Sequence, residues 1–420
     1  MIKGFIFEGF KGYDKAVLWL EQVTTLIGSN ASGKSNAIEG IQILSELASG
    51  RELNVIFDGT SNTESAVRGG AKGCCRFTAS SFTLGCLVNW NDTHDLLYRI
   101  SIGVDDRVAI NSEELYMVRN GNTKANGTMV FKATASSGSG DIAVIYANGK
   151  RGTNPHLNAI RSMSVLSQMQ GRLPADLENY NDMIDKINLV RNSLSNIFIL
   201  DPIPSMMRGY SRIGDSILRR NCANVSAVLY ALKQKHVAEW SEFEQIVREL
   251  PENEIKEIGF VRTTISDVIL VQKEENGSTF ANMDAARLSD GTLRCVAALA
   301  AVMSEPENSL IAIEELDNGI HPSRAQRLMA ALSGIAKRRH IDLLITTHNV
   351  TLLNSLNKDE VLGVSVVYRD ANTKASRITA FVDIRNQQGL LAAGGIGDAL
   401  ASEAILRAIK DTTEATPFAF

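Results

Sequence analysis

A nine-residue stretch, GSNASGKSN at positions 28–36, most strongly constrains what this chain folds into. It matches G-x-x-x-x-G-K-[ST], the phosphate-loop pattern. The two glycines let the backbone wrap tightly, so that several N–H groups face one anion, and a helix that begins directly afterwards adds partial positive charge. In this arrangement Lys34 contacts the β- and γ-phosphates, and the Ser35 hydroxyl binds Mg²⁺. The residues expected to bind the nucleotide here are Gly28, Asn30, Gly33, Lys34, Ser35 and Asn36.

The segments on either side of this loop support the match. Residues 23–27 are β-branched or apolar, which predicts a buried strand. Residues 35–47 carry apolar side chains at helical spacing, which predicts a helix. The alternative is a glycine- and serine-containing turn that matches by chance, and the order strand, loop, helix disfavours it.

Composition bounds the class of protein. The length of 420 residues predicts two or three domain-sized units. Hydrophobic content of 44% and charged content of 21% are typical of a soluble globular protein. The net charge of −4 provides no overall basic field for nucleic acid, so any contact with DNA requires a local patch or a dimer surface.

Cysteine usage and hydropathy indicate the compartment. The five cysteines are odd in number and include no C-x-x-C pair, which argues against a zinc site and a disulfide framework and favours reduced core thiols. Residues 1–5 lack the apolar region of a signal peptide, and no apolar run reaches the ~18 residues of a membrane span. We therefore expect a cytoplasmic protein.

The N-terminal half predicts a β-rich lobe and a helical lobe. Within residues 1–150, two strands precede that of the loop, residues 50–73 form a loop region, and short strands between residues 76 and 146 form an antiparallel meander. Residues 151–255 predict an inserted helical lobe, because apolar residues recur every three or four positions. A coiled coil is the alternative, but the repeat spans only about three heptads and favours a packed amphipathic helix.

The C-terminal half predicts an α/β lobe. Residues 256–385 begin with strands and then alternate helix and strand, with strands at 310–313 and 342–346. This alternation favours an α/β fold with a parallel core sheet. Residues 386–420 form a C-terminal segment in which Phe418 and Phe420 either dock on a partner or belong to a frayed end.

Polar residues follow both of these strands. Glu314 and Glu315 end the first, and in a phosphate-loop protein the first carboxylate lies beside Mg²⁺ while the second activates the attacking water. His348 follows the second strand and is suited to contact the γ-phosphate. Adjacent parallel strands joined by one crossover helix bring their ends together, which favours this function over an ordinary loop histidine.

A third motif, Leu-Ser-Asp-Gly-Thr at residues 288–292, opens a helix and predicts a second anion site. With this motif the chain resembles ATPases of the ABC superfamily, in the soluble branch of chromosome-maintenance, break-repair, RecF-type and OLD proteins. The resemblance covers the phosphate loop, signature, carboxylate strand, D-loop and switch histidine. It also includes residues 9–13, Gly-Phe-Lys-Gly-Tyr, where Lys11 corresponds to a basic residue that approaches the phosphates.

The resemblance implies a mechanism in which two heads enclose two ATP molecules with Mg²⁺. One head contributes the loop, Glu314, Glu315 and His348, and the other contributes Ser289 and Gly291, with Asp317 of the D-loop beside the nucleotide. ATP binding then closes the dimer and hydrolysis loosens it.

The chain departs from the family in three respects. Residues 46–146 contain no glutamine for the usual Mg²⁺ contact, so that Gln168 or Gln170 is the substitute expected. It has no long coiled-coil arm, and the nuclease pattern of OLD proteins is missing after His348. The stretches LDNGIHP at 316–322 and SDGTLR at 289–294 resemble those of compact ATPase subunits of the Septu, PARIS and retron-associated anti-phage systems. This resemblance implies a separate effector protein such as a nuclease and a DNA or phage-derived trigger.

Two other functions stay open on the sequence. A RecF-like DNA-binding ATPase in repair or recombination would use a basic patch, and the helical region holds Arg208, Arg212, Arg219 and Arg220. Internal salt bridges or a solvated helix face are the alternative for this cluster. A non-hydrolysing nucleotide switch is disfavoured by Glu315, which such a switch does not need.

Overall fold

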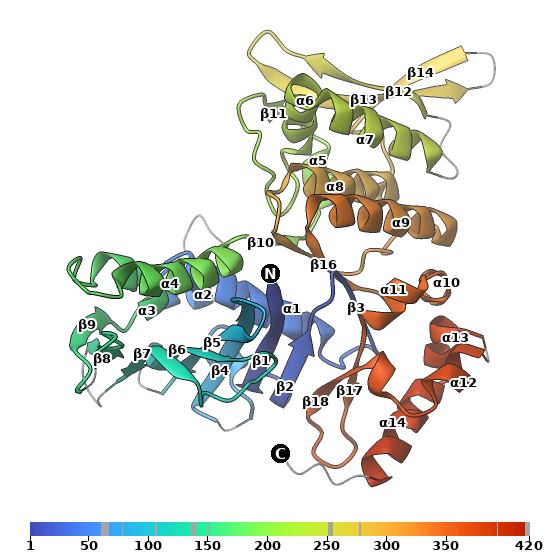
Figure 1. Ribbon diagram of the computed structural model, residues 1–420. Coiled ribbons are helices and arrows are strands. Elements are labelled where there is room, and N and C mark those ends of the chain that lie inside the picture. The colour runs from blue at the N-terminus through green and yellow to red at the C-terminus, as the bar shows by residue number, and fades with distance from the viewer. Residues whose placement is uncertain are drawn as a thin grey trace. The chain divides into compact units, whose positions relative to one another are not determined.

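The computed structural model describes residues 1–59, 67–77, 79–105, 107–135, 140–150, 152–250, 255–276, 279–392 and 394–415 (Figure 1). The chain divides into two compact units, each built from separate stretches of sequence. The first unit comprises Met1–Glu21, Gly28–Ile197 and Ser365–Ala380. The second comprises Gln22–Ile27, Phe198–Val364 and Phe381–Phe420.

The first unit is organised around a sheet with the strand order β17-β18-β2-β1-β4-β5-β6-β7-β8-β9. Its neighbouring strands are antiparallel except at the β18–β2 pair, where Ser376 lies opposite Tyr13 in parallel register. The strands are β1 (Ile2–Phe10), β2 (Tyr13–Trp19), β4 (Ser81–Asn89), β5 (His94–Gly103), β6 (Ala109–Arg119), β7 (Thr128–Thr134), β8 (Asp141–Tyr146), β9 (His156–Ile160), β17 (Val364–Arg369) and β18 (Ser376–Ala380).

Helices of this unit pack on the sheet through apolar faces. A Cβ on Gly40 of α1 would lie 2.7 Å from the Phe7 ring, so glycine permits the close approach of this helix to β1. Helix α4 buries Ile187, Val190 and Leu194, which confirms a packed amphipathic helix. The helices are α1 (Lys34–Ala48), α2 (Leu53–Asp58), α3 (Val165–Gln168) and α4 (Tyr180–Ser195), with 3₁₀ turns at Lys72–Cys74 and Met169–Gly171.

The second unit contains a parallel sheet in which β15 (Leu310–Ile313), β16 (Asp342–Thr346) and β3 (Val23–Ile27) are neighbours in that order. The three strands are almost entirely buried, as expected for a sheet covered by crossover helices. Helices α8 (Asp290–Ser304) and α9 (Pro322–Arg339) lie side by side in Figure 1 and contribute much of the buried apolar cluster.

A smaller antiparallel sheet and a set of C-terminal helices complete the second unit. The sheet has the order β11-β13-β12, with β14 also paired to β13, and α6 and α7 contact it (Figure 1). Its elements are β11 (Ser211–Arg212), β12 (Ile255–Arg262), β13 (Asp267–Asn276), β14 (Thr279–Asp284), α5 (Pro204–Met207), α6 (Val225–Lys235) and α7 (Val237–Glu249). The remaining elements are β10 (Ile197–Leu200), α10 (Val350–Asn354), α11 (Lys358–Leu362), α12 (Gln387–Ala392), α13 (Ile396–Ala401) and α14 (Ala404–Ala415), with a 3₁₀ turn at Phe381–Asp383.

The predicted α/β class, the parallel core sheet and the antiparallel β region are confirmed. Three local predictions were wrong. Residues 50–73 contain α2, because Leu53, Ile56 and Phe57 are buried at helical spacing within a polar stretch. A strand was expected at 76–80, but the described residues 76, 77, 79 and 80 are not in a strand, and Phe77 has φ +48° and is 82% exposed. The helical lobe also contains the strands β9, β10 and β11.

The two units cut across the four segments expected from the sequence. Helix α4 belongs to the first unit, where it contacts α1, whereas α6 and α7 belong to the second, where they contact α8. The tail residues Phe418 and Phe420 lie outside the described residues. Within the part of the chain that the structure describes, we find no helix with the length and hydropathy of a membrane span.

Candidate nucleotide-binding site

The phosphate loop has the backbone conformation that its glycines allow. Gly28 and Gly33 have φ +150° and +127°, and Ala31 is left-handed at φ +62°. A Cβ on Gly28 would lie 2.1 Å from the carbonyl oxygen of Val367 in β17, which is far inside van der Waals contact. A side chain at position 28 is therefore incompatible with the way the loop packs on this strand.

Three successive carbonyls of the loop accept hydrogen bonds from side chains elsewhere in the first unit. The Arg369 Nε donates to Ala31 O at 3.1 Å, the Ser376 Oγ donates to Ser32 O at 2.6 Å, and the Tyr13 hydroxyl donates to Gly33 O at 2.9 Å. The last two bonds are buried. Burial raises the pKa of Tyr13, so its hydroxyl keeps its proton and remains a donor.

The start of α1 is suited to an anion. Gly33 is the N-cap residue without a side-chain cap, and the first turn contains no acidic residue, so the positive end of the helix dipole is not neutralised there. The Lys34 Nζ donates to Gly28 O at 2.7 Å and to Ser29 O at 3.1 Å. The ammonium of Lys34 thus lies on the phosphate loop itself.

The predicted phosphate contact Lys11 is held by an acidic residue. Its Nζ lies 2.7 Å from the Glu39 Oε2, and the side chains of both residues are only 11% exposed. Glu39 is on α1 and also accepts from the backbone N–H of Arg68 at 3.0 Å. A nucleotide contact by Lys11 would have to compete with this ion pair.

In the second unit, Glu314 and Glu315 follow β15 at the carboxyl edge of the parallel sheet. The backbone N–H of Glu315 donates to the Thr346 Oγ1 at 2.8 Å, and Glu315 itself is left-handed at φ +49°. The Asn318 side chain donates to the Glu315 Oε2 at 3.3 Å. Glu315 is exposed and Glu314 is half-buried, so both carboxylates are accessible to a substrate.

The sequence did not single out Thr346, which joins the two strand ends that the motifs define. It is fully buried at the end of β16, and its carbonyl accepts from the Leu316 N–H at 3.3 Å. Two residues later His348 is exposed, and Asn349 caps α10 through its Oδ1. The run of Thr346 and Thr347 before His348 was the only signal available, and it is too common to assign a function.

The signature turn begins α8. The Ser289 Oγ accepts from the Thr292 N–H at 3.1 Å, which caps the helix. A Cβ on Gly291 would lie 2.5 Å from Gly319 O, so this glycine permits contact with the segment that follows Glu315. The structure therefore packs the signature motif against the D-loop of its own unit.

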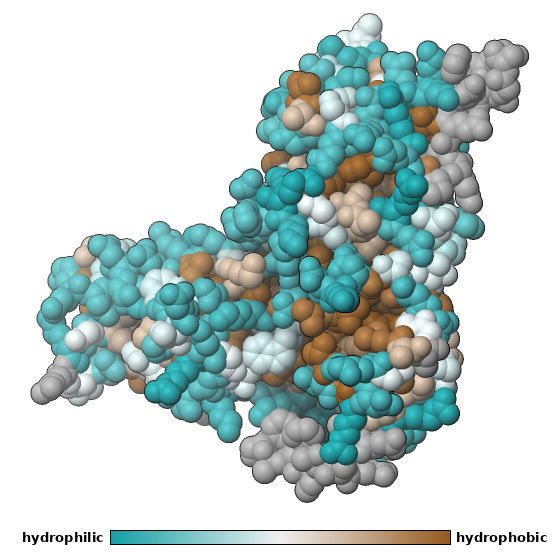
Figure 2. All heavy atoms as spheres, turned by 45° about the vertical axis from the view of Figure 1, so that its right-hand side comes forward, coloured by the Kyte–Doolittle hydropathy of each residue, from teal (hydrophilic) through white to brown (hydrophobic). Residues whose placement is uncertain are grey.

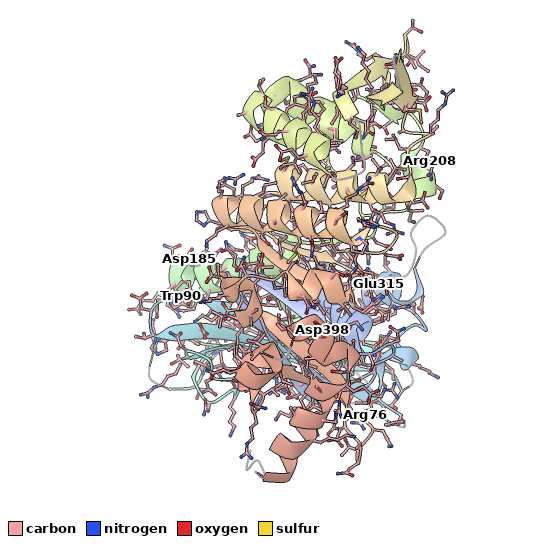
Figure 3. The ribbon with its side chains drawn as sticks, turned by 90° about the vertical axis from the view of Figure 1, so that its right-hand side faces the viewer. Arg76, Trp90, Asp185, Arg208, Glu315 and Asp398 are labelled. Atoms are coloured by element: carbon pink, nitrogen blue, oxygen red, sulfur yellow. The ribbon has the colours of Figure 1, made fainter. Side chains whose placement is uncertain are left out.

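An arginine outside all the motifs holds this turn. The Arg208 Nη2 donates to Leu288 O at 3.0 Å and to the Asp290 Oδ1 at 2.6 Å, which are on either side of Ser289. Figure 3 labels Arg208 at the end of α8. Asp317 of the D-loop is 8% exposed, and its Oδ1 has no hydrogen-bond partner among the described residues.

The expected site residues thus fall into two groups. The loop residues and Lys11 belong to the first unit, whereas Ser289, Gly291, Glu314, Glu315, Asp317 and His348 belong to the second. Gln168, the proposed glutamine substitute, is engaged elsewhere. Its Oε1 accepts a hydrogen bond from the Ile160 N–H and its Nε2 donates one to Ile160 O, both at 3.0 Å. These bonds cap the strand β9 and give Gln168 a structural function.

Hollows on the second unit lie apart from these residues. One, of about 560 Å³, is lined by residues 212–215 and 265–267, and another, of about 430 Å³, lies between α7 and α9. Neither is lined by a motif residue. Figure 2 shows one face of the molecule, which is mostly hydrophilic with apolar areas between.

Comparisons with known proteins match one part of the chain to a family model and find solved structures of similar fold. Residues 165–354 match the family described as "AAA domain, putative AbiEii toxin, Type IV TA system". This range contains the signature turn, both carboxylates and His348, and the match supports an ATPase-type domain there. A comparison with curated proteins found no match.

Similar solved structures are head domains of SMC proteins. One is an SMC head bound to the C-winged helix domain of ScpA, with 14% identity, a TM-score of 0.48, and coverage of 90% of this chain and 97% of that chain. The SMC head domain from Thermotoga maritima has 14% identity, a TM-score of 0.42, and coverage of 90% and 98%. The head from Pyrococcus yayanosii, with a coiled coil and joint, has 11% identity, a TM-score of 0.44, and coverage of 93% and 99%.

Proposed function

We propose that this chain binds and hydrolyses ATP, and that two copies dimerise around the nucleotide in the manner of ABC-type heads. The observation that carries the proposal is the parallel order of β15, β16 and β3. Glu314 and Glu315 follow β15, His348 follows β16, and Gly28 is the next residue of the chain after β3. All three parallel strands therefore lead into motif residues at their carboxyl ends.

Each group has a chemical role in this proposal. The loop N–H groups and Lys34 bind the phosphates, Glu315 accepts a proton from the attacking water, and His348 contacts the γ-phosphate. Ser289 and Gly291 of a second copy complete the site from the positive end of α8. Asp317 and Lys11 lie on segments that would border the nucleotide.

Mg²⁺ is the metal that these residues fit. The donors expected to hold it, the Ser35 hydroxyl and the Glu314 carboxylate, are hard oxygen ligands. The described residues contain no group of three or more His, Cys, Asp or Glu side chains that could hold a metal ion by themselves. This agrees with an ion bound by few protein ligands together with substrate phosphates, whose charge it neutralises.

Replacement of Glu315 by glutamine tests the proposal. We expect E315Q to bind ATP as the wild type does, to lose at least ~100-fold in turnover because the general base is gone, and to remain dimeric in ATP. Nucleotide binding, phosphate release and mass by light scattering measure the three effects. The control is E307Q, which replaces an exposed glutamate before β15. Wild-type turnover in E315Q would reject Glu315 as the base.

We further propose that the ATPase is a sensor or scaffold that controls a separate effector, such as a nuclease, in anti-phage defence. The description of the matched family names a toxin of a Type IV TA system, which supports an arrangement of two components. Co-purification with the product of a neighbouring gene tests this, with and without ATP. An ATPase that binds no neighbouring product would contradict it.

The alternative of a RecF-like DNA-binding ATPase loses support from the arginine cluster. Arg208 pairs with Asp290, and Arg219 pairs with Asp215 at 2.6 Å. Arginines engaged with carboxylates add less to a phosphate-binding surface than unpaired ones do. Salt-dependent binding of DNA in the presence of ATP would restore this alternative.

A further inference from the structure

We propose that Tyr13 and Ser376 are positioning residues for nucleotide binding, because they fix the orientation of the peptide groups at the end of the phosphate loop. The inference rests on the proposed binding of ATP at this loop. Ser376 belongs to no motif named above, and Tyr13 ends the segment 9–13, in which only Lys11 was assigned a role. Both lie in the first unit, so the geometry that carries the inference is contained in one compact unit.

The two donors reach the loop because of the sheet register. Ser376 on β18 lies opposite Tyr13 on β2, and its backbone N–H donates to Gly12 O at 2.8 Å. From these neighbouring positions, the Ser376 Oγ reaches Ser32 O and the Tyr13 hydroxyl reaches Gly33 O. Tyr13 is 0% and Ser376 is 1% exposed, so water cannot readily replace either donor.

Each bond controls an N–H group as well as a carbonyl. In a trans peptide the C=O and the following N–H point in opposite directions. Holding Ser32 O therefore directs the N–H of Gly33 away from Ser376. Gly33 O is held by the Tyr13 hydroxyl together with the Ala37 N–H at 3.1 Å, which directs the N–H of Lys34 away from Tyr13. A rotated peptide would instead present a carbonyl oxygen to the phosphate, where its partial negative charge repels the anion.

The packing around Ser376 supports this function. A Cβ on Gly33 would lie 2.9 Å from the Ser376 Oγ and 3.1 Å from the Tyr13 oxygen, and a Cβ on Gly12 would lie 2.5 Å from the same Oγ. Both glycines thus make room for the hydroxyl groups. The third hydrogen bond, from Arg369 to Ala31 O, is exposed. It holds the peptide group between Ala31 and Ser32, whose N–H already donates to Ser29 O at 3.2 Å, so this bond contributes less to the orientation of the loop.

The test compares Y13F and S376A with two matched variants of the same unit. Y98F removes the hydroxyl of another buried tyrosine, which bonds Glu113 at 3.0 Å, and S164A removes a buried serine hydroxyl that bonds the same carboxylate at 2.9 Å. Titration with fluorescent ATP and ADP analogues gives Kd, thermal unfolding gives Tm, and steady-state kinetics give KM and kcat.

We expect Y13F and S376A each to raise Kd about fivefold, equally for ATP and ADP, since one hydrogen bond to the loop is lost. KM should rise in parallel while kcat stays within twofold, because the residues proposed for hydrolysis belong to the other unit. Y98F and S164A should lower Tm as much without changing Kd. The double variant Y13F/S376A should bind more than tenfold more weakly.

The outcomes separate this inference from the proposed function. If the wild type binds no ATP, the proposed function fails. If the wild type binds but Y13F and S376A bind equally well, the inference is wrong. If the matched variants weaken binding as much, the effect is one of general stability and the inference is also wrong. Each variant removes a single oxygen, and either of them suffices if the other does not fold.

Discussion

Glycine geometry at single residues decides whether the phosphate loop can form. Gly28 combines φ +150° with a Cβ position that overlaps Val367 O, and Gly33 combines φ +127° with crowding by two hydroxyl groups. Both constraints exclude a side chain for reasons of conformation and of space. The glycines of the motif therefore have structural causes in this chain beyond the general need for a tight loop.

Replacement of Gly28 by alanine should strongly weaken nucleotide binding. The added methyl group must displace β17 or the loop, so we expect at least a ~30-fold rise in the Kd for ATP, together with a lower Tm. The control is G171A, because Gly171 lies in the same unit with open space around its Cβ position. Nucleotide titration measures both variants, and ATP binding by G28A at wild-type strength would contradict the packing described here.

Residues of the site differ in how far the sequence could predict them. Lys34, Glu314 and Glu315 occupy fixed positions in motifs whose chemistry is general. Ser376 lies in no motif, and the segment 9–13 that ends at Tyr13 assigned a role to Lys11 alone. The contribution of both hydroxyl groups becomes visible only when the strand register sets Tyr13 and Ser376 opposite each other. Thr346 was missed for the same reason, because its contact with Glu315 depends on pairing between β15 and β16.

At the scale of elements, regular patterns were predicted well and irregular ones were not. The strands expected at 310–313 and 342–346 are observed with these bounds as β15 and β16. A short apolar run between polar residues predicts both the type of element and its ends. Helix α2 was missed, since six residues in a polar stretch give too little periodicity. The capping of α8 by Ser289 followed from the signature motif itself.

Arg208 connects the segment after α5 to the first turn of α8. We expect R208Q to bind nucleotide normally and to lose three- to tenfold in turnover, because in the proposed dimer Ser289 would contact the nucleotide held by the other copy. The expected effect is modest because solvent screens this ion pair: the Arg208 and Asp290 side chains are 30% and 64% exposed.

Single-turnover and steady-state rates for R208Q, together with its Kd for ATP, measure this effect. R219Q is the control, because Arg219 makes a comparable exposed ion pair with Asp215 away from the signature turn. A weakened Kd in R208Q at unchanged kcat would show that the arginine supports the fold rather than the signature turn.

For the whole molecule, one buried carboxyl predicts how stability depends on pH. Glu113 accepts hydrogen bonds from Tyr98, from Ser164 and from the N–H groups of Val165 and Leu166. Burial raises the pKa of Glu113 from 4.5 to about 7, although these bonds lower it in part. The folded state therefore holds a proton that the unfolded chain releases at lower pH.

The resulting stability is fully present below pH 4.5 and is lost as pH rises to about 7, by up to ~3 kcal/mol. E113Q should remove the share of Glu113 and leave a weaker dependence, because burial also raises the pKa of Glu305 and of Asp342 to about 7. E114Q, on the opposite face of β6, should retain the full dependence. Denaturant unfolding at pH values from 5 to 8 measures the difference. A parallel pH dependence in wild type and E113Q would exclude Glu113 as its source.

The division into units is the part of the fold that the sequence predicted least. Contiguous segments were expected, but β3 pairs with β16, although more than 300 residues separate them in the chain. Likewise, β18 pairs with β2 and brings the end of the chain to its beginning. Hydrophobic periodicity identifies such strands but contains no information about which distant strand each one joins.

The hydrogen bonds that hold the phosphate loop also have a consequence for synthesis of the protein. The loop leaves the ribosome among the first 36 residues, but the donor that holds Ser32 O is residue 376 of 420. A nascent chain thus lacks this hydrogen bond to the loop until residue 376 has been translated. If the loop binds ATP as proposed, its competence to do so depends on a segment synthesised more than 300 residues after the loop itself.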